Sequence, residues 1–143
     1  MPTTLSSVLA LDVGEKRVGV AVASMAARLP RPLVTLEQGD ELLAALEKII
    51  EAEEASAIVV GLPRGLGGQR TAQTGIIEDF VAGLRQHFKD LPIHLQDEAL
   101  TSHKAEAELE GRGKDYKRGD IDALAATYIL EDWLGEQREL EKP

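Results

Sequence analysis

The sequence predicts a single α/β domain built on a mixed β-sheet with flanking helices. Two short apolar stretches near the N-terminus are separated by a link of hairpin length, which favours antiparallel neighbours. Further apolar strands then alternate with amphipathic helical stretches, a pattern typical of parallel strands. The chain has 143 residues, of which 43% are hydrophobic, and this is enough for one core. We therefore expect one domain over residues 1–143, with its core at about 8–134.

Three strands are expected before the first helix. Residues 8–13 and 18–23 are mostly apolar and partly β-branched, as in strands that lie inside a sheet. The four residues between them, 14–17, form the predicted hairpin link. A third extended segment is expected at 32–36, because two prolines in this region disfavour a helix.

Helices and strands are expected to alternate after residue 40. Asp40 and Thr101 are candidate N-caps for two of the helices. The polar residues after Gly135 are expected to form a frayed tail. The expected elements are, in order, a helix over 42–50, a strand over 56–60, a loop over 61–71, a helix over 76–84, a strand over 92–98, a helix over 101–109, a basic loop over 111–119 and a helix over 120–134.

Composition restricts the class of protein. The formal net charge of −9 argues against a protein that coats polyanions in general, but a local basic patch and bound divalent cations would still permit a nucleic-acid enzyme. The absence of cysteine removes disulfides and thiolate zinc sites, and it is compatible with a cytoplasmic location. The start of the sequence lacks the features of a secretory signal. No apolar run approaches the roughly 18 residues of a membrane span, so no membrane partner is expected.

Acidic residues end two of the expected strands and open the last helix. These are Asp12, the pair Asp97 and Glu98, and Asp122. Strand ends and helix starts converge at the functional edge of α/β sheets, and carboxylate oxygens suit hard cations such as Mg²⁺. Successive strand residues point to opposite faces, so at most one of Asp97 and Glu98 can join Asp12. Asp122 shares its helical face with apolar residues, where a solvated carboxylate is not expected.

Each of these acids also has a structural interpretation. Asp12 could begin a tight turn with the following Val-Gly, and Asp97 or Glu98 could be a solvated strand end. Asp122 could simply favour the positive end of its helix.

Two loops with several glycines carry basic residues that could contact phosphates. The loop over 61–71 contains Arg64 and Arg70, but it lacks the Gly-Lys-Ser/Thr of a P-loop and could be a plain mobile loop. The loop over 111–119 could form a flap that binds a nucleic-acid backbone, or it could be an ordinary solvated loop. Its basic residues are Arg112, Lys114, Lys117 and Arg118.

Four stretches occur in an order that resembles a known family: LALDVGEKRVGVAVA, IVVGLP, QDEALTS and DALAATYIL. Together they resemble the YqgF-type family of ribonuclease H-like proteins, which is associated with Holliday junction resolution and with cleavage of pre-16S ribosomal RNA. The match covers about residues 8–134. The resemblance implies a ribonuclease H-like fold, a mixed five-stranded sheet flanked by helices, and a nuclease that depends on Mg²⁺ or Mn²⁺.

The resemblance also implies roles for particular residues. The family's acidic positions, its metal ligands and catalytic residues, fall on Asp12, on Asp122 and on the Asp97–Glu98 pair, within which we favour Glu98. The match leaves open which metal is bound.

Basic positions of the family are matched as well, with two departures. Lys16 and Arg17 match the basic residues after the first strand, where nucleic acid would be contacted. Ala99 stands where the family usually has an arginine, which puts any phosphate contact by that arginine in doubt. Ser102 replaces the second threonine of the family's Leu-Thr-Thr and keeps the hydroxyl.

The leading hypothesis is an endonuclease that processes the 5′ end of pre-16S ribosomal RNA or cuts branched DNA such as a Holliday junction. One alternative is a nucleotide-binding phosphotransferase-like domain, because the Asp-Val-Gly hairpin resembles the phosphate-binding hairpin of actin and sugar kinases. Another is a non-catalytic RNA-binding protein of ribosome assembly. The expected partner is nucleic acid, and the expected state is a monomer or a homodimer.

Overall fold

The structure, a computed structural model, describes residues 6–65, 67–98 and 118–141. The expected helix over 101–109 and the basic loop up to residue 117 lie outside these residues. None of the helices in the described ranges combines the length and apolar character needed to cross a bilayer. The elements are β1 (Ser7–Val13), β2 (Arg17–Ser24), β3 (Arg31–Glu37), α1 (Leu42–Glu53), β4 (Ala55–Pro63), α2 (Ala72–His87), β5 (Ile93–Glu98) and α4 (Arg118–Glu141).

The strands form one mixed five-stranded sheet in the order β3-β2-β1-β4-β5. β1 and β2 form the predicted antiparallel hairpin, and β3 extends it on the outer side. β4 and β5 are added in parallel on the other side of β1. The parallel strands β1, β4 and β5 therefore end at the same edge of the sheet, with β1 at its centre.

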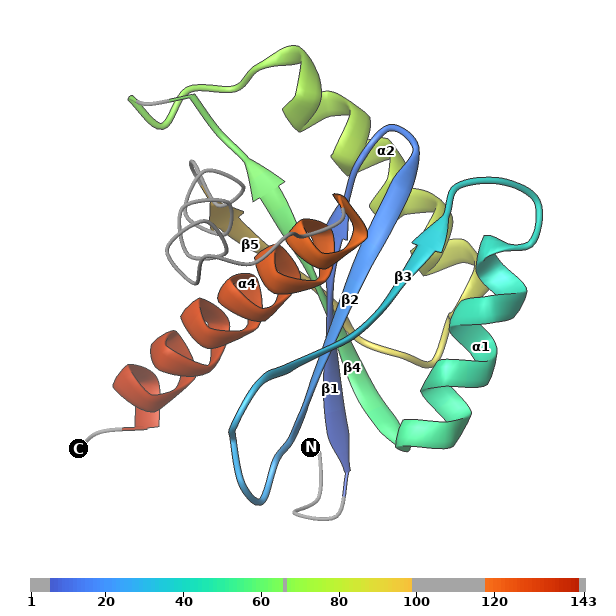
Figure 1. Cartoon of the computed structure of the whole chain (residues 1–143). Helices are drawn as coiled ribbons and strands as arrows, with labels where there is room; N and C mark the ends of the chain where they lie inside the picture. Colours follow the sequence, from blue (N-terminus) through green and yellow to red (C-terminus); the bar gives the residue numbers. More distant parts are fainter. Residues whose placement is uncertain (1–5, 66, 99–117, 142–143) are drawn as a thin grey trace.

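Helices cover both faces of this sheet: α4 lies on one face, and α1 and α2 lie on the other (Figure 1). The side chains of β1 alternate between the two layers. Leu9 and Leu11 join the core beneath α1 and α2, whereas Val8 and Ala10 join the core beneath α4. All four are fully buried. By the same alternation Asp12 follows Ala10 onto the face covered by α4.

The expected strands and helices before residue 99 are confirmed, with different ends. β4 continues through Pro63 into the expected loop, because it keeps pairing with β5 up to Glu98. α2 begins earlier than expected because Thr71 and Thr74 form a reciprocal capping box. The expected cap of α1 by Asp40 is wrong: Glu41 is the N-cap residue, and its side chain makes no capping hydrogen bond.

The last helix is longer than expected at both ends. α4 begins at Arg118, which we had expected in the basic loop, and it continues past Gly135 to Glu141. The expected frayed tail is therefore wrong up to residue 141. Glu136 on this extension accepts a hydrogen bond from Gln96 Nε2 at 3.0 Å, so the extra turns remain in contact with β5.

Candidate active site

Asp12 lies near the carboxyl end of the central strand, on the face that α4 covers. It is half-buried, and its register partner on the neighbouring strand β2 is Gly19. Burial, and then the nearby carboxylate of Asp122, raise the pKa of Asp12 from 3.8 to about 7. The ionised form of Asp12 is therefore disfavoured at this point of the sheet.

Gly19 brings the second carboxylate to the first. A Cβ atom at this position would lie only 2.0 Å from the backbone oxygen of Asp122, so α4 rests directly on the β2 backbone. Because Gly19 is also the cross-strand partner of Asp12, the glycine places the start of α4 beside the end of β1. Our sequence reasoning missed this residue, although a glycine inside an apolar strand is a signal of close backbone approach.

Arg17, the first residue of β2, pairs with Asp122. Its Nε donates a hydrogen bond to Asp122 Oδ2 at 2.7 Å. Both side chains keep contact with solvent, with 32% of Arg17 and 22% of Asp122 exposed. Arg17 was expected to contact nucleic acid, and the structure places its guanidinium at the acidic pair instead of in open solvent.

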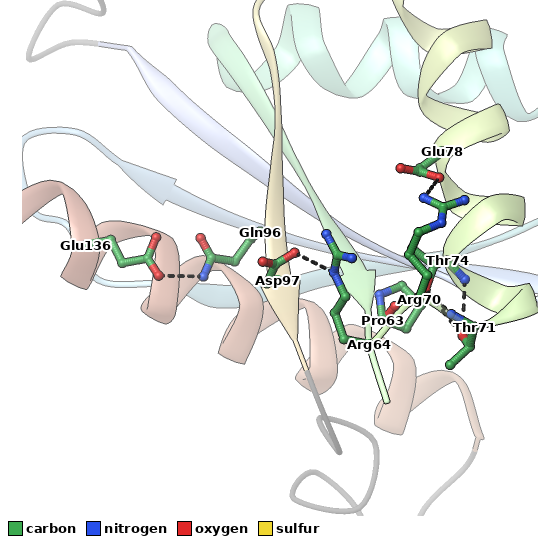
Figure 2. A network of polar contacts seen from close by, with 9 residues as sticks. All are labelled: Pro63, Arg64, Arg70, Thr71, Thr74, Glu78, Gln96, Asp97 and Glu136. Carbon is green, nitrogen blue, oxygen red and sulfur yellow. Dashed lines mark hydrogen bonds and ion pairs between the residues drawn. The ribbon is translucent and has the colours of Figure 1, made fainter. Parts of the chain in front are cut away.

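Glu98 lies at the same edge and on the same face as Asp12. Gln96 points toward α4, where it bonds Glu136, so alternation along β5 turns Glu98 to that face and Asp97 away from it. Figure 2 shows Gln96 and Asp97 pointing in opposite directions from the strand. One oxygen of Glu98, Oε1, is buried.

The register explains why Glu98 stands apart from the pair formed by the other two acids. Leu11 pairs with Val60, and Val60 with Leu95, so Asp12 is level with the residue after Leu95 and two residues short of Glu98. β4 also lies between the two strands, which separates their backbones by roughly 10 Å or more. Accordingly, the described part of the chain contains no cluster of three Asp, Glu or His side chains that could hold a metal ion.

The Asp12–Asp122 pair nevertheless fits a hard divalent cation. Mg²⁺ is usually bound by one or two carboxylates and keeps several waters, so the pair is a sufficient protein ligand set. The raised pKa of Asp12 supports this fit, because a cation would offset the repulsion and burial that disfavour the ionised form.

The arginines of the loop after β4 pair with other acids. Arg64 Nε lies 3.2 Å from Asp97 Oδ1, and Arg70 forms an ion pair with Glu78 on α2 (Figure 2). Asp97 is the acid that points away from α4. These two arginines therefore do not converge on the Asp12–Asp122 pair.

The remaining basic candidates are placed only in part. Lys16 is exposed in the turn between β1 and β2, where its carbonyl oxygen accepts a hydrogen bond from the backbone N–H of Gln38. Arg118 is the first residue of α4. Three further candidates lie outside the described residues: Arg112, Lys114 and Lys117.

The sheet order, the N-terminal antiparallel hairpin and the helices on both faces define a ribonuclease H-like protein with an acidic pair at the end of its central strand. The chain belongs to the RuvX family, whose model is described as "Holliday junction resolvase" and matches residues 6–136. The predicted YqgF-type membership is confirmed.

A curated relative supports the family, and two solved structures support the fold. A protein of Maridesulfovibrio salexigens named "Putative pre-16S rRNA nuclease" is 42% identical over 131 residues, which is 89% of this chain and 96% of the relative. The RuvC of T. thermophilus, solved with a Holliday junction substrate, is similar with a TM-score of 0.54 at 16% identity, over 92% of this chain and 96% of that chain. The Fowlpox virus resolvase, solved with Holliday junction DNA, gives a TM-score of 0.52 at 10% identity, over 95% of this chain and 99% of that chain. The predicted ribonuclease H-like fold is confirmed.

Proposed function

We propose that this protein is a divalent-metal-dependent endonuclease that hydrolyses phosphodiester bonds in structured nucleic acid. The observation that carries the proposal is the Asp12–Asp122 pair, two carboxylates brought together from positions 110 residues apart. The description of the family as a resolvase and the nuclease name of the relative support the same reaction class.

Three acidic residues have distinct parts in this proposal. Asp12 and Asp122 bind the cation, and Glu98 supplies a third carboxylate on the same face, nearer to the end of the sheet. A bound Mg²⁺ or Mn²⁺ lowers the pKa of a water and offsets charge on the scissile phosphate. Gly19 lets the backbone of Asp122 lie directly on β2, beside the position that pairs with Asp12, which supports a shared site for the two principal ligands.

The first substrate to test is the 5′ end of pre-16S ribosomal RNA, since a relative at 42% identity carries that name. Branched DNA comes second, on the description of the family. We place the protein in the cytoplasm, where ribosomal RNA precursors are processed in bacteria.

Cleavage assays with the purified protein test this function. The wild-type protein is incubated with a pre-16S ribosomal RNA fragment or a four-way DNA junction, in Mn²⁺, Mg²⁺ or EDTA. We expect cleavage of at least one substrate that requires the metal and falls by at least about a hundredfold in Asp12→Asn and Asp122→Asn. Asp132→Asn, which changes an exposed acid on the same helix, is the matched control and should cleave normally.

Two outcomes would refute the proposal. Undiminished cleavage by both Asp12→Asn and Asp122→Asn would show that the pair is not the site. RNA affinity without turnover, unchanged in these variants, would favour a non-catalytic role in ribosome assembly.

A further inference from the structure

The Arg17–Asp122 ion pair engages an oxygen that a metal ion would share. We propose that Arg17 is a displaceable counter-ion: it neutralises Asp122 in the metal-free protein and moves to a nucleic-acid phosphate when a divalent cation takes its place. The inference rests on the proposed nuclease function, and it assigns Arg17 a positioning role that links metal binding to substrate binding.

The ion pair between Arg17 and Asp122 is short, and the Arg17 side chain is exposed enough to leave it. A charge-assisted hydrogen bond of 2.7 Å joins Arg17 Nε to Asp122 Oδ2. About a third of the Arg17 side chain is exposed, so the guanidinium can turn toward solvent without crossing the core. Its backbone stays fixed meanwhile, because the carbonyl oxygen of Arg17 accepts the backbone N–H of Gly14 at 2.8 Å in the hairpin.

The charges favour exchange when a cation arrives. A divalent ion on the Asp12–Asp122 pair supplies the positive charge that Arg17 provides in its absence, and it repels the guanidinium at short range. The displaced guanidinium would remain at the edge of the site, because Arg17 is the first residue of β2, and it could then bind a phosphate of the substrate. Guanidinium groups bind phosphate oxygens well because their planar donors match them.

Arg17 differs in this respect from three other arginines that form ion pairs. Arg64 pairs with Asp97, Arg70 with Glu78, and Arg31 with Glu53 at the opposite end of the sheet. None of these acids belongs to the Asp12–Asp122 pair. Among these ion pairs, that of Arg17 is the one that involves a proposed metal ligand.

Two measurable couplings follow. Because Arg17 competes with the cation for Asp122, its removal should tighten metal binding. Because the released guanidinium binds phosphate, the metal should add one ionic contact to nucleic-acid binding, and by linkage nucleic acid should tighten metal binding.

Metal affinity is the first test and requires no turnover. Isothermal titration with Mn²⁺ alone should give a dissociation constant for Arg17→Gln that is roughly two- to fivefold lower than for the wild type, the size expected for one partly exposed ion pair. Arg17→Lys keeps the charge and should bind Mn²⁺ like the wild type. Arg31→Gln removes the same charge at the far end of the sheet, and it should also bind Mn²⁺ like the wild type.

The salt dependence of RNA binding is the second test. Affinity for a short RNA hairpin is measured over a series of KCl concentrations in EDTA and in Mn²⁺, with the RNA checked for cleavage on a denaturing gel. In Mn²⁺ the slope of log affinity against log salt should be about one unit shallower in Arg17→Gln than in the wild type, because one phosphate contact is lost. In EDTA the two slopes should be equal.

The outcomes separate this inference from the proposed function. If the wild type binds no Mn²⁺, the metal site itself is wrong, and both proposals fall. If the wild type binds Mn²⁺ but Arg17→Gln binds it equally or more weakly, the nuclease proposal stands and the counter-ion role is refuted. Equal salt slopes in Mn²⁺ would likewise refute the transfer of Arg17 to phosphate.

Discussion

Replacing Asp12 by asparagine should stabilise the metal-free protein, and increasingly so as the pH rises. The folded protein raises the pKa of Asp12 from 3.8 to about 7, first by burial and then by the charge of Asp122. Between these values the native state holds a proton that the unfolded chain has released, so stability falls as the pH rises and levels off above about 7. Asparagine does not titrate, so the free energy of unfolding of the variant does not fall with pH for this reason.

The magnitude follows from the shift. A difference of about 3 pKa units corresponds to about 4 kcal/mol, and about half of this falls between pH 5.5 and pH 8. We therefore expect the stability gain of Asp12→Asn to be about 2 kcal/mol larger at pH 8 than at pH 5.5. The assay is urea unfolding in EDTA, with the free energy of unfolding extrapolated to water at each pH.

The control for this prediction is Asp132→Asn, whose exposed side chain should give a stability curve parallel to that of the wild type. Adding Mn²⁺ should reverse the order, because the cation binds and stabilises the wild type while the variant has lost a ligand. If the wild type and Asp12→Asn keep the same stability difference from pH 5.5 to pH 8, burial and Asp122 do not raise the pKa of Asp12, and the argument is wrong.

Three further substitutions test the geometry. Gly19→Ala places a Cβ 2.0 Å from the backbone oxygen of Asp122. It should lower the free energy of unfolding by about 2 kcal/mol or more and weaken Mn²⁺ binding. Wild-type values in urea unfolding and in Mn²⁺ titration would contradict the close approach. Glu98→Gln should reduce cleavage at least about tenfold. Asp97→Asn, on the opposite face, should leave Mn²⁺ affinity unchanged. Normal cleavage by Glu98→Gln together with weaker Mn²⁺ binding by Asp97→Asn would show that Asp97, not Glu98, is the acid of the site. Thr74→Val removes a buried hydroxyl that donates at 2.6 Å to the carbonyl oxygen at the end of β4, and it should destabilise the protein by about 1–2 kcal/mol in the same unfolding assay; an unchanged stability would mean that α2 is held by other contacts.

Much of the fold could be predicted because its signals are local. The apolar runs of β1 and β2 and the short link between them predict an antiparallel hairpin, since hairpin geometry depends on a few adjacent residues. Alternation along a strand is equally local, and it predicts that Asp97 and Glu98 point to opposite faces, as the contact of Gln96 with α4 indicates. The ends of elements were less predictable. β4 continues to Pro63 because it pairs with β5, and β5 lies too far along the chain for a local sequence pattern to show this pairing.

The sequence by itself determined the sheet, the helices that flank it and the set of acids at the edge where β1 and β5 end. Only the tertiary structure decided which of those acids meet. Asp12 and Asp122 come together because α4 rests on the bare backbone of Gly19, and Arg17 pairs with Asp122 across 105 positions. Such contacts depend on the packing of one element against another, and residue types and their spacing along the chain do not encode that packing locally.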